Sequence, residues 1–233
     1  EVVPRLQQEV RNEAADLRQS VNLVARRCAV PAGRPIRCVF LVHAIESWDA
    51  QVDLYEAMRD DPRFEPIAVS INRHFPGDAG FAGEDRVHEE LESLGVPHLR
   101  LGMGNSFQAV DILRALAPDV IFRQSQWCND LPPAFHASRL NFARICSVPY
   151  GTSIVERFSP GEQPVNGVSE QSFDLPYHRL AWRIFCETEQ TRDFLASFQH
   201  GAADKFVVTG YPKLFRLLKG REETDAWPIR RPG

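Results

Sequence analysis

Apolar runs alternate with helix-period stretches along most of the chain. The run from Ile36 to Val42 is almost continuously apolar, as is typical of a parallel strand that is buried on both faces. Such an alternation predicts the α/β class: a Rossmann-like, doubly wound, mostly parallel sheet with right-handed crossovers. The expected strands are 36–42, 66–71, 98–101, 120–122, 143–148, 183–186 and 206–209, and the expected helices are 48–60, 84–94, 106–116 and 188–199.

The segment before this pattern has a different period. Val3, Val10, Leu17 and Val24 recur every seven residues, which predicts a helix over 5–28. Three heptads alone are marginally stable in water, so this helix either lies against the body or belongs to a coiled coil that joins copies of the chain. The predicted organisation is an amphipathic or coiled-coil helix over 1–30, a Pro- and Gly-containing linker over 31–35, a Rossmann-like domain over 36–215 and a second linker over 216–233.

Composition and charge narrow the class of protein. Of the 233 residues, 43% are hydrophobic and 25% are charged, which supplies enough apolar surface for a core and excludes a disordered chain. The net charge is −4 and basic residues concentrate at the two ends, so the body is acidic and nucleic acid is not expected as a partner. The basic ends leave peripheral contact with an anionic membrane as an alternative to plain solvated surface.

The cysteines and the apolar runs indicate where such a protein would work. The five cysteines contain no C-x-x-C pair, and three of them fall in or beside apolar runs, where a free thiol behaves as a small core residue. This favours a reducing cytoplasm over disulfides or a structural zinc site. The longest apolar run, 38–42, is far shorter than the ~20 residues that a membrane-spanning helix needs. We therefore expect a cytoplasmic protein, with the inner face of the plasma membrane as an alternative peripheral location.

Polar and aromatic side chains follow most of the predicted strands. In open α/β sheets, ligands bind outside the carboxyl ends of the strands, so these positions are the candidate site. His43 is a candidate general base, Tyr150 a second catalytic candidate, and Trp48 a candidate stacking ring. Together they would suit a polyhydroxylated or phosphorylated ligand. The candidate substrate-binding residues are Ser47, Trp48, Asp49, Arg73, Gln124, Gln126, Gly151, Thr152, Glu187, Gly210, Tyr211 and Lys213.

Motifs for cofactors and metals are missing from the sequence. The run Gly102-Met103-Gly104 lacks the third glycine of a dinucleotide-binding fingerprint. The chain contains no P-loop, no H-E-x-x-H pair and no G-x-S-x-G elbow. We therefore expect neither a redox cofactor nor a metal ion.

Three groups of segments, in this order and spacing, carry a family resemblance. They are 40–48 with 54–58 and 61–65, 118–126 with 131–133 and 148–152, and 186–189 with 205–213. Together they resemble the CDP-glycerol glycerophosphotransferase family over about residues 36–215. The resemblance implies a GT-B architecture, in which the first Rossmann-like half recognises the acceptor and the second binds most of a nucleotide-linked donor.

The resemblance also implies an activity. This chain would be the acceptor-side half of a transferase that builds teichoic-acid-like or capsule polymers from a nucleotide-linked donor and a glycan or polyol-phosphate acceptor, without a metal. Alone it would be inactive, because the cleft needs both halves. Tyr150 stands where many family members carry a catalytic histidine, and a phenol is a poor base at neutral pH. His43 is then the alternative base, and a sugar transferase fits as well as a glycerophosphate transferase.

Two hypotheses from other classes remain open. The chain could be a non-catalytic scaffold of a multidomain synthase, with the helix over 5–28 as its oligomerising element. It could also be half of a sugar-nucleotide epimerase-like enzyme, since such enzymes share the two-domain fold.

Overall fold

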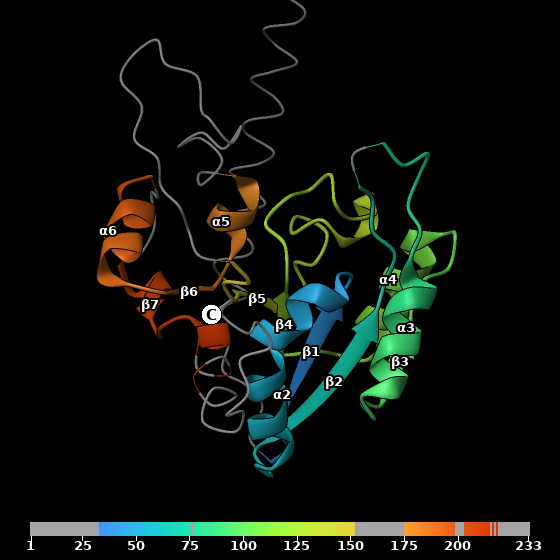
Figure 1. Ribbon diagram of the computed structural model, residues 1–233, viewed down its shortest axis with the longest axis horizontal. Coiled ribbons are helices and arrows are strands. Elements are labelled where there is room, and N and C mark those ends of the chain that lie inside the picture. The colour runs from blue at the N-terminus through green and yellow to red at the C-terminus, as the bar shows by residue number, and fades with distance from the viewer. Residues whose placement is uncertain are drawn as a thin grey trace, which may run out of the picture.

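The computed structural model describes residues 33–75, 77–151, 175–198, 203–214, 216 and 218 (Figure 1). Three predictions lie wholly or largely outside these residues: the helix over 5–28, the binding role of Thr152 and the linker over 216–233. The homo-oligomer expected through that helix therefore stays a prediction, and so do the domain boundaries. No helix in the described part of the chain combines the length and apolar character that a bilayer span requires.

The described residues form one parallel sheet in the order β3-β2-β1-β4-β5-β6-β7. Each strand lies in a segment where the apolar runs predicted one, which confirms the doubly wound class. β1 is an interior strand between β2 and β4, and its Phe40 pairs with Ala68 on one side and Phe122 on the other. The strands are β1 (Ile36–Val42), β2 (Phe64–Ser70), β3 (His98–Arg100), β4 (Val120–Arg123), β5 (Arg144–Ser147), β6 (Arg183–Cys186) and β7 (Phe206–Val208).

The helices differ from the expected ones in two places. The helix expected over 48–60 is a 3-10 turn followed by a shorter α-helix. A short helix, α5, follows residues that the composition predicted as a long connection; at five residues it is too short to show a helical period. The α-helices are α2 (Val52–Arg59), α3 (Glu84–Ser93), α4 (Ser106–Ala115), α5 (Pro176–Leu180) and α6 (Glu189–Phe198), and the 3-10 turns are η1 (Ile45–Ala50), η2 (Pro133–Phe135) and η4 (Ala203–Lys205).

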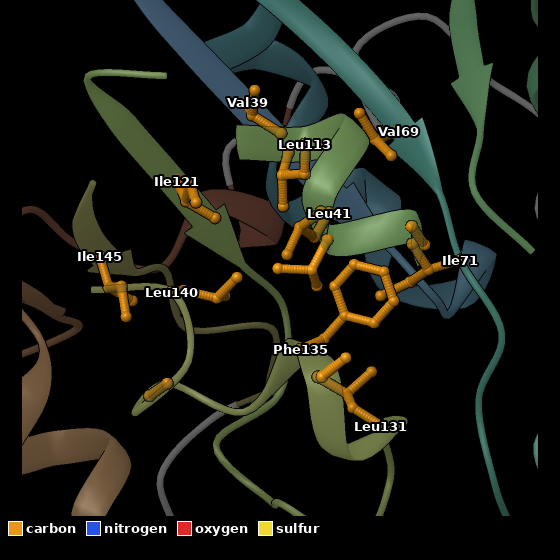
Figure 2. Close-up of a cluster of buried hydrophobic side chains, with 14 of the residues drawn as sticks. Val39, Leu41, Val69, Ile71, Leu113, Ile121, Leu131, Phe135, Leu140 and Ile145 are labelled. Carbon is orange, nitrogen blue, oxygen red and sulfur yellow. The ribbon is translucent and has the colours of Figure 1, made fainter. Parts of the chain in front are cut away.

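The sheet buries both of its faces, which explains the unbroken apolar run of β1. Val39 and Leu41 point into one core, which α4 and η2 help to cover (Figure 2). Phe40 and Val42 point into the other core, beneath α2 and α3. Successive strand residues alternate between faces, so a strand covered on both sides must be apolar at nearly every position.

Trp48 belongs to the second core, and the prediction that its ring stacks on a ligand is wrong. Only 3% of the residue is exposed. Its ring lies edge-on to Phe40 and against Tyr55, with centroid separations of 6.2 and 5.5 Å. The turn η1 directs the indole back onto the apolar face of the sheet, because burying an aromatic ring there removes a large apolar surface from water.

Candidate functional site

The strand order reverses between β1 and β4. From β1 the chain runs outward through β2 to β3, then returns through α4 to β4 on the opposite side of β1. The helices α2 and α4 consequently pack on opposite faces of the sheet. Such a switch point leaves a crevice at the carboxyl ends of the two strands, which is where ligands bind in open α/β folds.

Two adjoining pockets occupy this edge. The smaller one has a volume of about 320 Å³, and four predicted residues that line it are His43, Ser47, Arg73 and Gln124. Tyr150 lines it too, so both catalytic candidates face the same space. The larger pocket, of about 620 Å³, shares His43 and Arg73 and extends along residues 78–83. The structure thus brings together candidates that lie up to about a hundred residues apart in the sequence.

Gln124 holds the crevice together. Its side-chain oxygen accepts hydrogen bonds from the backbone N–H groups of His43 and Ala44, at 2.9 and 3.0 Å. Its side-chain nitrogen donates to the carbonyl oxygen of Ala44 at 3.0 Å. The side-chain amide of Gln124 therefore bonds three backbone groups of the segment after β1 and fixes the position of His43. Most of the hydrogen-bonding capacity of this amide is used in the protein and is not left for a ligand.

His43 is neutral at physiological pH in this structure. Only 4% of the residue is exposed, and its Nδ1 has no hydrogen-bond partner among the described residues. Burial, and then the positive charges of Arg123 and Arg73, lower its pKa from 6.5 to about 3. The imidazole is thus unprotonated at neutral pH, and it would bind an added proton only weakly.

Arg123, at the end of β4, is a fully buried cation behind the crevice. It is 0% exposed, and its Nη2 donates to the carbonyl oxygen of Trp127 at 2.9 Å. Its guanidinium carbon lies 4.6 Å from the centre of the Tyr177 ring. Neither Nε nor Nη1 has a hydrogen-bond partner of normal geometry among the described residues. Burial lowers the pKa of Arg123, and its charge is one cause of the low pKa of His43.

Tyr150 supplies a protonated phenol at the other side of the smaller pocket. Partial burial raises its pKa above 10, and the nearby charge of Asp130 acts in the same direction, against a hydrogen bond from Trp127. At neutral pH this side chain is therefore a hydrogen-bond donor and not a base. Its carbonyl oxygen accepts a hydrogen bond from the Tyr211 hydroxyl at 3.3 Å.

The segment after β7 returns to this edge and holds the turn η1. The Nζ of Lys213 donates to the carbonyl oxygen of Glu46 at 3.0 Å and lies 2.7 Å from the Asp49 carboxylate. Gly210 precedes this segment with φ of +85°, a conformation that glycine adopts at least cost. Asp49 and Lys213, both predicted to bind substrate, thus bind each other in this structure and shape the rim.

Three other predicted residues do not line either pocket. Gln126 bonds the Nε2 of His178 at 3.1 Å, which ties the segment after β4 to α5. Glu187 follows β6, farther along the sheet from the switch point. Gly151 is exposed and has open space where a Cβ would lie, so a ligand has room to approach the backbone there.

Sequence reasoning missed the loop residues that complete the pockets. Asp130, whose carboxylate accepts a hydrogen bond from the Ser125 hydroxyl at 2.7 Å, lines the smaller pocket. The backbone N–H of His74 donates to the carbonyl oxygen of Asp130 at 3.0 Å, so this loop meets the end of β2. No apolar period or motif signals such a return. Within the described ranges, no group of three or more His, Cys, Asp or Glu side chains is arranged to hold a metal.

Comparisons with known proteins place the fold. No protein-family model matches the chain, so none supports the resemblance to the CDP-glycerol glycerophosphotransferase family. No curated protein matches either. Solved structures do match at the level of the fold. The structure of UDP-GlcNAc 2-epimerase from Neisseria meningitidis, bound to UDP-GlcNAc, aligns with a TM-score of 0.54 and 11% identity over 80% of this chain and 49% of that one.

A second solved structure gives the same result. A putative UDP-N-acetylglucosamine 2-epimerase from Listeria monocytogenes aligns with a TM-score of 0.51 and 14% identity, over 86% of this chain and 50% of its own. This chain therefore spans about half the length of both. At this level of identity the likeness shows the fold alone: a Rossmann-like α/β unit like those of GT-B-like proteins.

Proposed function

We propose that the chain forms the acceptor-side half of a GT-B-like transferase that moves a group from a nucleotide-linked donor to a glycan or polyol-phosphate acceptor. The proposed pathway is the synthesis of a cell-surface polysaccharide or a teichoic-acid-like polymer. The observation that carries the proposal is the smaller pocket, in which His43, Arg73 and Tyr150 face one space at the β1–β4 switch point.

Each of these residues has a role in the proposed transfer. The acceptor oxygen attacks the electrophilic carbon or phosphorus of the donor, and the bond to the nucleotide breaks so that its phosphate leaves with the electron pair. The Arg73 cation and the Tyr150 phenol stabilise the charge that develops on the phosphate oxygens. The proton of the acceptor hydroxyl passes to the neutral imidazole of His43.

The low pKa of His43 suits a base that works only when the donor is bound. A nucleotide diphosphate beside the imidazole adds negative charge, which favours its protonated form and raises its pKa. Without that anion, burial and the two arginines oppose protonation. We therefore expect proton acceptance to depend on the donor, which would limit unproductive protonation of the site.

An epimerase acting on a nucleotide sugar is the second candidate function. It is favoured by the solved structures with the same fold, which are described as UDP-GlcNAc 2-epimerases. Epimerisation needs groups that remove and return protons, and the smaller pocket offers the carboxylates of Glu46 and Asp130. The two functions differ in a measurable way, because an epimerase needs no acceptor.

The test is a reaction of the full-length protein with UDP-GlcNAc, CDP-glycerol and a panel of other nucleotide sugars, followed by NMR, with and without glycan and polyol-phosphate acceptors. A transferase releases the nucleotide only when an acceptor is present. An epimerase instead converts UDP-GlcNAc to its C2 epimer without an acceptor, and that result would replace the first proposal by the second.

Variants test the residue assignments in the same assay. His43→Asn and Tyr150→Phe should each lower the transfer rate at least about tenfold, a loss of roughly 1.4 kcal/mol of transition-state stabilisation. Tyr55→Phe is the matched control, because Tyr55 packs in the second core and does not line either pocket. Full activity of both site variants would show that these side chains do not act in the reaction.

A further inference from the structure

The larger pocket is built on the loop between β2 and α3. Arg73 and Ala82 pair across the loop through two backbone hydrogen bonds, at 2.9 and 2.8 Å. The N–H of Phe75 donates to the carboxylate of Asp78 at 2.8 Å, and a ring nitrogen of His74 lies 3.1 Å from the carbonyl oxygen of Asp78. Hydrogen bonds thus close the loop at its base and fix its interior, so the side chains that it presents to the pocket are preorganised.

This loop presents two aromatic rings to the pocket. Phe75 and Phe81 both line it, although 47% and 41% of these residues stay exposed. The ring of Phe81 lies against the ring of His74, with centroids 5.6 Å apart. The Arg73 guanidinium lies over the ring of Phe75. Exposed aromatic residues that gather at one cavity form an apolar patch of the kind that marks ligand-binding grooves.

The charged groups of the pocket balance one another. Arg73 and Arg86 are two cations, and Glu46 and Asp78 are two anions. The Glu46 carboxylate lies 2.8 Å from the guanidinium of Arg86 and 3.4 Å from that of Arg73. Ion pairs with an exposed partner contribute little to stability, so a ligand that hydrogen-bonds to both charged groups can compete with them.

We propose that the larger pocket binds a neutral sugar ring of the acceptor. Sugar hydroxyls both donate and accept, so they can bond carboxylates and guanidinium groups side by side. The attraction of a phosphate to Arg73 and Arg86 would instead be offset by its repulsion from Glu46 and Asp78. The apolar face of a sugar ring would lie on Phe81, and Ile45 and Val87 supply further apolar lining to the pocket. The assignment of this ring to the acceptor rests on the proposed function, since the smaller pocket next to it would hold the reacting groups.

Binding of simple glycosides tests the proposal directly. The full-length protein is titrated with the methyl β-glycosides of glucose and N-acetylglucosamine, and binding is followed by saturation-transfer NMR. We expect Phe81→Ala to weaken binding about fivefold and Phe81→Trp, with its larger ring, to strengthen it. The matched control is Phe107→Ala on α4. Phe107 is 53% exposed and lines neither pocket.

Three results would overturn the assignment: no glycoside binding, equal loss in Phe81→Ala and Phe107→Ala, or binding of glycerol 3-phosphate more than tenfold tighter than that of the glycosides. UDP-GlcNAc and CDP-glycerol are titrated into the same variants. Glycoside binding that depends on Phe81, together with a failure to bind or turn over any nucleotide-linked compound, would leave the sugar site standing and remove the proposed function. Nucleotide-dependent transfer at the same rate in the wild type and in Phe81→Ala would support the proposed function and remove the sugar site.

Discussion

At the scale of the residue, burial decides which protonation state each group in the site holds. His43 is neutral because its imidazole is desolvated beside two arginines, and Tyr150 keeps its proton because partial burial disfavours the phenolate. The sequence identified both positions, since each follows a predicted strand. It could not give their charge states, because Arg123 and Arg73, which lower the pKa of His43, come from other strand ends.

The first prediction at this scale concerns acid stability. The unfolded chain binds a proton at His43 below pH 6.5, whereas the folded chain does so only near pH 3. The contribution of His43 to stability is therefore fully present above pH 6.5 and is lost as the pH falls from 6.5 to 3, by up to about 1.4 kcal/mol per pH unit. His43→Gln should remove this dependence.

The measurement is the free energy of unfolding by urea at several values of pH between 3 and 7, for the wild type and His43→Gln. Carboxylates also titrate in this range, but their contribution is common to both proteins and cancels in the difference. The gap between the two curves should change steadily with pH. A constant gap would mean that His43 has an ordinary pKa in the folded protein.

At the scale of the element, the strands were the most predictable part. Two-sided burial forces an apolar residue at nearly every position of β1, and that pattern is visible in the sequence. The turn η1 was not predictable, because it depends on Trp48 packing against Phe40 and Tyr55. The loop that carries Phe81 was missed because it has no apolar period: hydrogen bonds within the loop hold it, and one from the His74 N–H joins it to Asp130, far away in the chain.

The tie between β1 and β4 gives a prediction at this scale. Gln124→Ala leaves the backbone N–H groups of His43 and Ala44 without their present partner, whereas the carbonyl oxygen of Ala44 keeps a hydrogen bond from the Ser47 N–H at 3.1 Å. A buried polar group without a partner costs about 1–3 kcal/mol, so we expect the variant to lose roughly 2–4 kcal/mol of stability. Chemical denaturation measures this loss as a lower midpoint.

The control for this variant is Gln108→Ala, an exposed position on α4, for which a change within about 0.5 kcal/mol is expected. A Gln124→Ala variant as stable as this control would contradict the role assigned to the amide. Sequence reasoning had placed Gln124 at the site as a ligand contact. Its backbone partners lie about 80 residues away along the chain, and no local pattern encodes them.

At the scale of the whole molecule, the segment after the last strand, β7, is bonded to the turn and helix that follow β1. The residues after β7 return to η1 and α2, where Lys213 bonds Glu46 and Asp49, and the Arg216 guanidinium lies 2.7 Å from the Asp53 carboxylate. The carboxyl edge is therefore framed by segments from both ends of the described fold (Figure 1). Lys213 thereby holds Glu46, which lines the smaller pocket.

A double-mutant cycle on Lys213→Met and Asp49→Asn measures that closure. Half of the Asp49 side chain is exposed, so the coupling energy between the two charges should be only about 0.5–1 kcal/mol. Lys213→Met alone should cost more than Asp49→Asn, because it also loses the hydrogen bond to the Glu46 carbonyl oxygen. Equal costs of the two single variants would indicate that this bond adds nothing to stability.

The buried arginine at the end of β4 has a consequence for anyone who redesigns this protein. No carboxylate in the described part of the chain forms an ion pair with the buried Arg123 guanidinium, and an apolar side chain of similar volume would avoid the cost of burying that charge. A search for thermostable sequences guided by packing energy would replace Arg123 among its first choices. Burial is the largest cause of the low pKa of His43, and the same change would remove one of the two positive charges that lower it further, so a more stable variant would also have a less depressed pKa at His43.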